Sequence, residues 1–385
     1  MKRAGIQEIA AQAKVSIGTV DRALHGRDGI SEVTREKVLR IAKQLGYEPN
    51  LAARALKVGR ANLRIGVCIP QEIHFFYDQV RAGIFDEAKR QGHWAVEILY
   101  KPVPSLGEGE TAALRELLAS ELHGLIVTPG NPKIVDPIIA RAEKDGVRVV
   151  CTTTDAPESG RSTMVAVEPR LAGSMAAELL AKFLPTGSSA IAVTGMLRTV
   201  EHRLKMEGFS ETFRRLCRGG NVAGVIEGHE AEQETYAKTR ATLEKDAGIR
   251  GIYVSTVNCL PVCQAISELK LKNTVKLITT DLFAEMVPYI KDGTIAASIY
   301  QRPYVQGQLA LRILIDHLVN GIALGGENYL NPSIALLSNL SLFRETAQQG
   351  RSALTHMGVP RSGRGARRGS ADQGRSPVEP LRGSA

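Results

Sequence analysis

From Leu63 onward, short apolar segments alternate with amphipathic ones, and this alternation constrains the fold more than any other feature of the chain. Leu63–Ile69, Leu125–Thr128 and Val147–Thr152 are apolar and have the length of buried strands. Tyr77–Gln91 and Lys133–Asp145 instead have apolar residues at helical spacing. Because strands that alternate with helices build parallel sheets covered on both faces, we expect an α/β fold over this part of the chain.

The alternation continues long enough to build two lobes. A second set of strands and helices starts near Met164–Val167 and runs to Val275–Thr280. We expect the core to span 61–346, with a first lobe of about 61–162 and 297–327 and a second lobe of 163–296 and 328–346. Ligands bind at the carboxyl ends of strands in open parallel sheets, so we expect a small polar molecule to bind between the lobes.

The first fifty residues are patterned differently, as three short helices. Apolar residues at helical spacing cover 6–13, and a second such segment covers 17–24. Ser16 and Ser31 are suitable N-caps for the second and third helices, and the third ends at Gly46. Two short helices around a tight turn, with a third packed on them, form a helix-turn-helix unit. Such a unit places its second helix in the major groove of DNA.

The basic charge of the chain lies at its two ends. Residues 1–60 contain twelve Lys and Arg against six Asp and Glu, and residues 351–385 contain seven against two. Since the whole chain has a net charge of +9, the part between these ends is slightly acidic. A basic, folded head on a near-neutral body indicates a polyanion as its partner. The tail at 350–385 is rich in Gly, Arg, Ser and Pro without periodicity, so we expect it to be disordered.

The head also carries a family resemblance. Its segments are Ile9-Ala10, Val15-Ser16-Ile17-Gly18-Thr19-Val20-Asp21-Arg22-Ala23-Leu24, Thr34-Arg35-Glu36-Lys37-Val38, Leu45-Gly46-Tyr47-Glu48-Pro49-Asn50 and Ala53-Arg54-Ala55-Leu56. In these segments the chain resembles the LacI/GalR-type (lac/galactose repressor) family of transcription regulators. The two α/β lobes resemble the effector domain of that family, which has a periplasmic sugar-binding-protein-like fold. The resemblance implies a ligand-responsive regulator, most often a repressor, that binds a pseudo-palindromic DNA operator as a homodimer.

The resemblance implies particular contacts for the second helix of the head, which belongs to a DNA-binding domain at 1–49. Ile17, Gly18 and Arg22 fall where family members read bases, and Ser16 and Thr19 fall where they contact the DNA backbone. An arginine can donate two hydrogen bonds to guanine, which is worth about 1–3 kcal/mol of discrimination. Isoleucine offers only an apolar contact there, and glycine offers no side chain.

A hinge at 50–60 follows the head. Asn50 can cap a helix that is shorter than the ~12–15 residues at which isolated helices become stable in water, so we expect it to order only beside a dimer mate on DNA. By resemblance, Asn50 contacts the DNA backbone, while Ala53 and Leu56 lie on a helix that enters the minor groove. Leu56 matches the wedge that kinks the central base step. A flexible helical linker is the alternative.

Aromatic and polar residues near the expected strand ends are candidates for contact with a sugar-like effector. They are Phe76, Tyr77, Thr153, Asp155, Arg203, Asn258, Asp281 and Gln301. Aromatic rings can stack on a sugar ring, and carboxylates accept hydrogen bonds from vicinal hydroxyls. The last four match positions that contact ligand in sugar-binding relatives.

For some of these residues a structural role is the alternative. Phe75 or Phe76 can belong to the core, Thr153 can cap a loop, and Asp281 can be the N-cap of a helix. Glu168 stands where the family commonly has Asp, and we interpret it as a helix cap.

The sequence argues against several other classes of protein. Its eight histidines form no metal-binding pair, no GxSxG elbow or Walker loop occurs, and no nucleophile has an evident base, so we expect no enzyme, metal or cofactor. The five cysteines are scattered, as in a reduced cytoplasmic protein. No apolar run approaches the ~18 residues of a membrane helix. A sugar-binding protein without a regulatory role and a sugar-modifying enzyme remain the alternatives.

Overall fold

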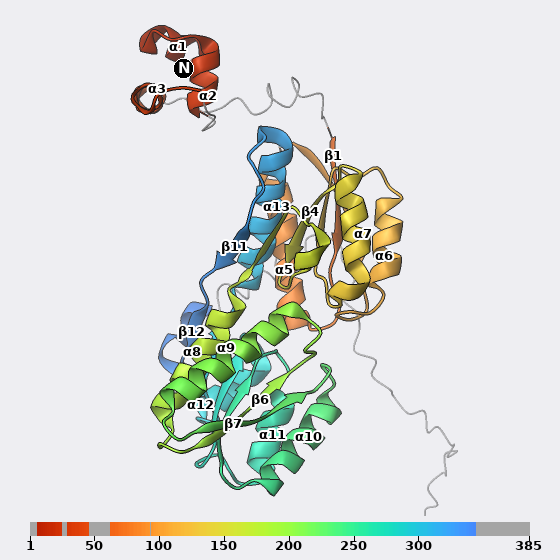
Figure 1. The fold of residues 1–385 in the computed structure, drawn as a ribbon, viewed down its shortest axis with the longest axis vertical. Helices are drawn as coiled ribbons and strands as arrows, with labels where there is room; N and C mark the ends of the chain where they lie inside the picture. Colours follow the sequence, from red (N-terminus) through yellow and green to blue (C-terminus); the bar gives the residue numbers. More distant parts are fainter. Residues whose placement is uncertain (1–5, 25–28, 46–61, 93, 344–385) are drawn as a thin grey trace, which may run out of the picture.

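The computed structural model describes residues 6–24, 29–45, 62–92 and 94–343, which form a helical head and a body of two lobes (Figure 1). The predicted hinge at 50–60, with Asn50, Ala53 and Leu56, and the tail at 350–385 lie outside the described residues. Within the described part of the chain, no helix is both long and apolar enough to cross a membrane.

The head consists of the three predicted helices, α1 (Ile6–Ala13), α2 (Ile17–Leu24) and α3 (Glu32–Gln44). The backbone N–H of Thr19 donates to Ser16 Oγ at 3.1 Å, and that of Thr34 donates to Ser31 Oγ at 3.3 Å. Both predicted N-caps are therefore confirmed, and each satisfies a backbone donor that the first turn of a helix leaves open. The helices enclose a small core that includes the fully buried Val20.

The first lobe is a six-stranded parallel sheet in the order β11-β5-β4-β3-β1-β2. Its strands are β1 (Asn62–Cys68), β2 (Ala95–Tyr100), β3 (Gly124–Val127), β4 (Arg148–Thr152), β5 (Thr163–Val167) and β11 (Glu327–Leu330). Its helices are α5 (His74–Arg90), α6 (Glu110–Leu118), α7 (Pro132–Lys144) and α13 (Pro303–Asn320), with a 3₁₀ turn at Pro157–Ser159.

The second lobe is another six-stranded sheet, in the order β12-β10-β9-β8-β6-β7, in which only the β10–β12 pair is antiparallel. Its strands are β6 (Ser189–Thr194), β7 (Asn221–Glu227), β8 (Ile249–Val254), β9 (Lys276–Thr280), β10 (Ile295–Tyr300) and β12 (Ser333–Ala335). Its helices are α8 (Pro169–Phe183), α9 (Val200–Leu216), α10 (Glu232–Lys245), α11 (Leu260–Glu268) and α12 (Val287–Lys291), with 3₁₀ turns at Ala284–Met286 and Leu337–Asn339.

The predicted boundaries between the lobes need correction at all three crossings. The sequence interpretation assigned 163–167 to the second lobe, but this segment is β5, which pairs in parallel with β4 of the first sheet. It also divided 295–300 between the lobes, but this segment is the intact strand β10 of the second sheet. It divided 327–330 as well, which is the intact strand β11 of the first sheet. The chain therefore crosses after β5, after β10 and after β11. Apolar composition identifies a buried strand, but strand pairing decides to which sheet it belongs.

The central strands of each sheet are buried on both faces, as their near-continuous apolar sequences predict. Successive side chains of β3 alternate between two core clusters: Leu125 and Val127 pack in one, and Ile126 packs in the other. The helices α5 and α13 cover one face of the first sheet, and α6 and α7 cover the other (Figure 1). In the second lobe α8 and α9 cover one face, and α10 and α11 cover the other.

Glycines allow the paired helices to pack with their backbones close together. A Cβ added to Gly83 of α5 would overlap the carbonyl oxygen of Tyr304, and one added to Gly307 of α13 would overlap that of Val80. The second lobe repeats the arrangement. A Cβ added to Gly173 of α8 would overlap the carbonyl oxygen of Lys205, and one added to Gly208 of α9 would overlap that of Arg170. Each lobe is thus built around one tightly packed pair of helices.

Candidate functional site

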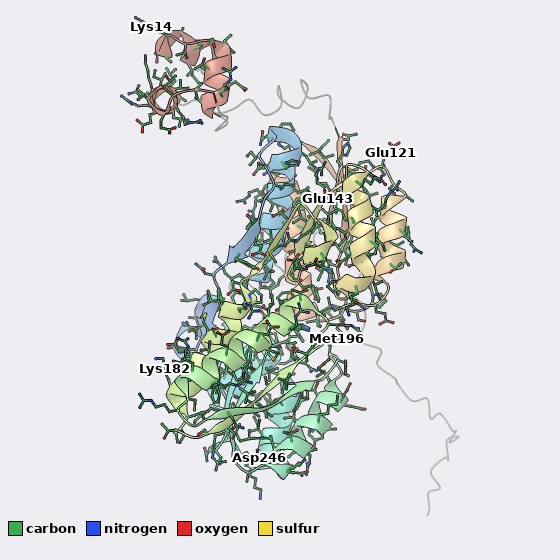
Figure 2. The ribbon with its side chains drawn as sticks, in the orientation of Figure 1. Lys14, Glu121, Glu143, Lys182, Met196 and Asp246 are labelled. Carbon is green, nitrogen blue, oxygen red and sulfur yellow. The ribbon has the colours of Figure 1, made fainter. Side chains whose placement is uncertain are left out.

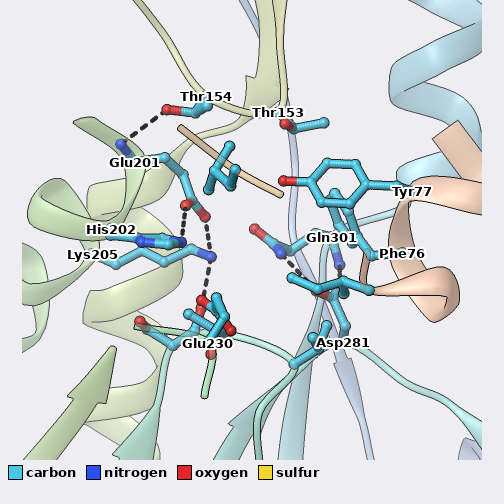
Figure 3. A pocket seen from close by; sticks show the side chains of 15 residues that line it. Phe76, Tyr77, Thr153, Thr154, Glu201, His202, Lys205, Glu230, Asp281 and Gln301 are labelled. Atoms are coloured by element: carbon cyan, nitrogen blue, oxygen red, sulfur yellow. Dashed lines mark hydrogen bonds and ion pairs between the residues drawn. The ribbon is translucent and has the colours of Figure 1, made fainter. Parts of the chain in front are cut away.

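A pocket lies between the two lobes, beside the carboxyl ends of the strands (Figure 3). It contains about 420 Å³ of space, counted out to the solvent. The first lobe contributes Ile73, Phe76, Tyr77, Leu106, Thr153 and Thr154 to its lining. The second lobe and the crossing after β10 contribute Glu201, His202, Lys205, Glu230, Ser255, Thr256, Val257, Asp281 and Gln301.

Four lining residues have a backbone conformation that non-glycine residues rarely adopt. The φ angles are 55° at Ile73, 66° at Thr153, 57° at Glu230 and 64° at Asp281. Each comes from a different loop, and each conformation costs of order 1–3 kcal/mol unless the surroundings compensate. Such strain concentrates at functional sites. These four loops therefore adopt conformations that form the pocket at a cost in local stability.

A buried group of charged residues on α9 forms one wall of the pocket. Lys205 is ion-paired with Glu201, and its Nζ donates to the carbonyl oxygen of Ser255 at 3.0 Å. His202 Nδ1 accepts from the backbone N–H of Met196 at 3.0 Å, so the proton of a neutral imidazole lies on Nε2, which is 3.4 Å from Glu201 Oε2. Figure 2 places Met196 on the side of the second lobe that faces the first.

Burial and charge act on this group in opposite directions. Burial lowers the pKa of His202, which favours the neutral imidazole. Burial also opposes the charge of Lys205, but Glu201, Tyr253 and Asp281 together outweigh burial, so the pKa of Lys205 is raised. Lys205 therefore keeps its charge beside Glu201, and His202 lies next to the pair as a neutral imidazole.

Asp281 lies at the opposite side of the pocket and is held by Gln301. Gln301 Nε2 donates to Asp281 Oδ2 at 2.8 Å, and its backbone N–H donates to Oδ1 at 3.3 Å. Burial raises the pKa of Asp281 to about 6, even though Lys205 and the Gln301 hydrogen bonds lower it. The carboxylate is thus fixed in orientation and keeps lone pairs with which to accept from a ligand.

Glu230 reaches the pocket from the loop after β7. A Cβ on Gly195 would overlap both Glu230 Oε1 and the His202 ring, so the glycine leaves room for these side chains. Glu230 Oε2 is buried and has no hydrogen-bond partner among the described residues. Burial, followed by the charge of Glu72, raises the pKa of Glu230 to about 8.

The aromatic residues of α5 have two different roles. Phe76 and Tyr77 line the pocket, with their rings edge to face at 5.2 Å, and the Tyr77 hydroxyl points toward the middle of the pocket (Figure 3). Phe75 instead stacks on Phe283 of the second lobe, with ring centroids 4.3 Å apart. Phe75 therefore joins the lobes, whereas Phe76 lines the pocket and also packs in the core of the first lobe.

The structure brings five of the eight predicted effector residues to the pocket and places three elsewhere. Phe76, Tyr77, Thr153, Asp281 and Gln301 line it. The other three do not line it. Asp155 is buried in an ion pair with Arg161, and Arg203 is exposed beside Glu207. Asn258 Nδ2 donates to Thr235 Oγ1 at 2.9 Å.

The charged lining residues that sequence reasoning missed were partly detectable. Glu201, Lys205, Phe209 and Phe213 are spaced by four along α9, so they share one face of the helix. Because that face carries the buried phenylalanines, its polar members at the amino-terminal end face inward, whereas Arg203 does not lie on this face. For Glu230, the signal was its position just after an apolar strand.

The predicted DNA-contacting residues of the head lie on its surface. Ser16, Gly18 and Arg22 are exposed, Thr19 is half-buried, and the Ile17 side chain is 52% exposed although it is apolar. Since the opposite face of α2 packs in the core of the head, the amino-terminal end of the helix is available for a partner. The individual contacts with bases and backbone remain predictions.

The described residues give no sign of a metal centre. No group of three or more His, Cys, Asp or Glu in the described ranges is placed to hold a metal ion. All five cysteines are buried and free.

Comparison with known proteins identifies both parts of the chain. Residues 65–322, well over half of the chain, match the model of the periplasmic binding protein domain, and residues 5–50 match that of the bacterial regulatory proteins of the lacI family. The chain belongs to the lacI family of bacterial regulatory proteins. As a lacI-family protein it is a DNA-binding transcriptional regulator that responds to a ligand, and its second part is a periplasmic binding protein domain.

Individual relatives agree with this assignment. Catabolite control protein A of Priestia megaterium is 25% identical over 351 residues, which cover 89% of this chain and 99% of that protein. A solute-binding protein of Burkholderia graminis, solved in complex with D-arabinose, superimposes with a TM-score of 0.67 at 21% identity over 72% of this chain and 96% of that chain. A glucose-galactose binding protein of Geobacillus stearothermophilus gives 0.66 at 22% identity over 72% and 99%. The two structures show that the body of this lacI-family protein has their fold.

Proposed function

We propose that this lacI-family regulator is a repressor that binds a pseudo-palindromic operator as a homodimer in the cytoplasm. We further propose that a small sugar or related polyol in the pocket between the lobes controls its affinity for DNA. One observation carries the proposal: a single chain joins a head with an exposed α2 to a pocket lined by hydroxyl, amide and carboxylate groups.

The chemistry of the pocket supports a hydroxylated ligand. Asp281, oriented by Gln301, can accept from vicinal hydroxyls, and the hydroxyls of Thr153 and Tyr77 can donate or accept. One protein of the same fold was solved in complex with D-arabinose, and another is a glucose-galactose binding protein. Such a ligand contacts both lobes, so it favours one relative orientation of the lobes and thereby one spacing of the two heads.

Two other functions are less well supported. A solute-binding protein without a regulatory role would have no use for the helix-turn-helix head. A sugar-modifying enzyme would need an acid and a base that act together, but Glu201, His202 and Lys205 are engaged with one another and Gln301 holds Asp281, which leaves Glu230 as a single open carboxyl group. We therefore propose reversible binding without turnover.

The DNA part of the proposal is tested by selection from a library of random duplexes with the full-length protein. We expect enrichment of two inverted half-sites, and retention of the enriched duplex should fall steeply with salt because phosphate contacts release counterions. Enrichment of a single unrepeated site, or of no sequence at all, would contradict the proposed dimer on a palindromic operator.

The effector part is tested with Asp281→Ala. A panel of pentoses, hexoses and polyols is first screened for compounds that change the affinity of the wild type for the selected duplex. We expect Asp281→Ala to retain duplex binding and to lose the response, whereas Asp246→Ala, which changes an exposed residue at the end of α10, should keep it. A normal dose–response in Asp281→Ala would place the effector elsewhere.

A further inference from the structure

The lining of the pocket has more acidic than basic side chains. Three carboxyl groups, those of Glu201, Glu230 and Asp281, line it together with one lysine, Lys205. Lys205 is paired with Glu201, which also lies beside His202 Nε2. Lys205 also lowers the pKa of Glu230 and of Asp281, so a single lysine that is already paired with Glu201 faces three carboxyl groups.

We propose that the effector carries a protonated amine in addition to its hydroxyl groups, and that Glu230 binds this ammonium group. The ligand class is then an amino sugar or an amino polyol rather than a neutral sugar. This inference rests on the proposed function, in which a hydroxylated small molecule occupies the pocket.

The placement of Glu230 is the first support for an ammonium ligand. Its Oε2 is buried and has no partner in the described part of the chain, although an unpaired buried carboxylate is costly. Its backbone has a φ of 57°, and Gly195 makes room for the side chain. A costly backbone conformation thus carries a carboxyl group into a space where the acting cation, Lys205, is already paired with Glu201, and burial raises the pKa of Glu230 so that it is protonated at neutral pH. A ligand ammonium group would supply the missing counter-charge, so that Glu230 releases its proton and its open oxygen gains a partner.

The second support is the negative potential at Tyr77, which lies across the pocket from Glu230. The pKa of Tyr77 is raised well above its usual value, first by burial and then by Glu201, Glu230, Glu72 and Glu110. The charges that raise this pKa most are all carboxyl groups, so an ammonium group beside the hydroxyl would be stabilised. The rings of Phe76 and Tyr77 add to this preference, since aromatic faces attract ammonium groups.

The opposite side of the pocket suits the hydroxyl groups of the same ligand. Asp281 is held by two donors from Gln301 and accepts from further hydroxyls, and Thr153 offers a hydroxyl from the first lobe. Figure 3 shows Glu230 and Asp281 at separate positions in the pocket, so the ammonium and the hydroxyls of one molecule have different partners.

The test compares matched compounds by titration calorimetry with the full-length protein. The panel contains the 2-amino-2-deoxy derivatives of glucose, galactose and mannose, the 1-amino-1-deoxy alditols, the neutral parent of each, and the N-acetyl derivatives of the amino sugars. We expect at least one amine to bind ten or more times more tightly than both its neutral parent and, where there is one, its N-acetyl derivative. Binding of neutral parents as tight as that of the amines, or no binding of any amine, would overturn the proposal.

Glu230→Gln identifies the residue responsible. It should reduce the preference for the amine at least tenfold, whereas Glu232→Gln, an exposed residue two positions away, should retain it. Glu230→Ala is a second variant, and the thermal melt of each variant confirms that it is folded. An unchanged preference in folded Glu230→Gln and Glu230→Ala would remove Glu230 from ammonium binding and overturn the proposal.

Failure of this inference differs from failure of the proposed function. A neutral sugar that binds and alters duplex affinity would overturn the ammonium ligand and leave the regulator intact. An amine that binds through Glu230 without changing duplex affinity would support the ligand class and contradict the proposed control of DNA binding.

Discussion

At the scale of residues, the buried ion pair between Lys205 and Glu201 is the most consequential local feature. The Lys205 side chain is 1% exposed and that of Glu201 is 11% exposed, so water screens neither charge well. Removal of one member of a buried pair leaves the other without compensation, which costs more than the intact pair contributes.

Lys205→Met should therefore destabilise the protein markedly. We expect the free energy of unfolding, measured by urea denaturation, to fall by about 3–5 kcal/mol. The double variant Lys205→Met, Glu201→Gln should recover much of this loss, because neither member of the pair is then left charged without its partner. The matched control is Arg203→Met, whose side chain is 47% exposed, and it should change stability by less than about 0.5 kcal/mol. Equal losses in both single variants would show that Lys205 is not buried as described.

Glu230 should make stability depend on pH in an unusual direction. Burial raises its pKa to about 8 from the usual 4.5, so between these values the folded state binds a proton that the unfolded state has lost. The stabilisation by this proton is present at pH 4.5 and is lost as the pH rises to 8. We expect Glu230→Gln to gain stability over the wild type at pH 8.5 and much less at pH 5, as measured by urea denaturation at both values. A difference that does not depend on pH would contradict the raised pKa.

Arg22 should set base preference at one symmetric pair of operator positions. Its side chain is exposed in the last turn of α2, at a position where the resemblance places a base contact. With the selected duplex and its single-base variants, Arg22→Ala should lose about 1–3 kcal/mol of discrimination at that pair. Arg40→Ala, an exposed arginine on α3, should affect all duplexes alike. Uniform weakening by Arg22→Ala as well would mean that Arg22 contacts only the DNA backbone.

Sequence reasoning placed strand ends at the pocket better than it placed side chains on helices. Asp281 and Gln301 follow strands directly, so their positions were predictable from strand ends alone. On α9 a shift of two residues along the helix changes the face, and this separates Lys205 in the pocket from Arg203 on the surface. Glu230 depends on a left-handed loop, a conformation that its residue type does not signal.

At the scale of elements, the close packing of α5 on α13 and of α8 on α9 depends on small residues. Gly83 and Gly307 each face the backbone of the partner helix, so neither helix can carry a side chain at the point of closest approach. Such backbone contacts have no flexible side chain that could move aside, which makes these positions intolerant of even one methyl group.

Gly83→Ala should destabilise the first lobe although alanine favours helices. The added Cβ would overlap the carbonyl oxygen of Tyr304, and overpacking of this kind costs typically about 1–3 kcal/mol. The control is Gly224→Ala in β7, where an added Cβ meets no atom within 4 Å. Thermal unfolding of both variants measures the difference. A Gly83→Ala variant as stable as the wild type would show that the two helices can separate without cost.

The elements themselves were largely predictable, whereas their pairing was not. The head helices, their caps at Ser16 and Ser31, and the cap at Glu168 follow from short-range patterns. The predicted cap at Glu168 is confirmed, because its side chain accepts hydrogen bonds from the backbone N–H groups of Arg170 and Leu171. The assignment of β5 and β11 to the first sheet depends on contacts between segments about 160 residues apart, for which local patterns carry no signal.

At the scale of the whole molecule, a few contacts join the two lobes around the pocket. Thr199 Oγ1 donates to the carbonyl oxygen of Gly130 at 2.8 Å, and the Tyr300 hydroxyl donates to Gln79 Oε1 at 3.3 Å. Phe75 of α5 packs against the core of the second lobe as well as against the Phe283 ring. The relative orientation of the lobes therefore depends on few interactions, as expected for lobes that respond to a ligand.

Phe75→Ala should favour a more open arrangement of the lobes. Stacked aromatic pairs contribute about 0.5–1.5 kcal/mol beyond their buried area, so their loss should reduce the closed population several-fold. We expect a larger radius of gyration in small-angle scattering, and effector affinity should fall by the same factor. Phe183→Ala removes a ring that is 44% exposed at the end of α8 and should change neither quantity. Unchanged scattering in Phe75→Ala would mean that this contact does not hold the lobes together.

The three crossings between the lobes also determine how the molecule responds to a break in its chain. The polypeptide passes from one lobe to the other after β5, after β10 and after β11. A protease that cleaves one of these crossings therefore leaves the other two crossings intact. The fragments would stay associated under native conditions and separate only in denaturant. A nicked protein would thus keep its pocket assembled, and its lobes would gain freedom to twist that the other two connections otherwise restrict.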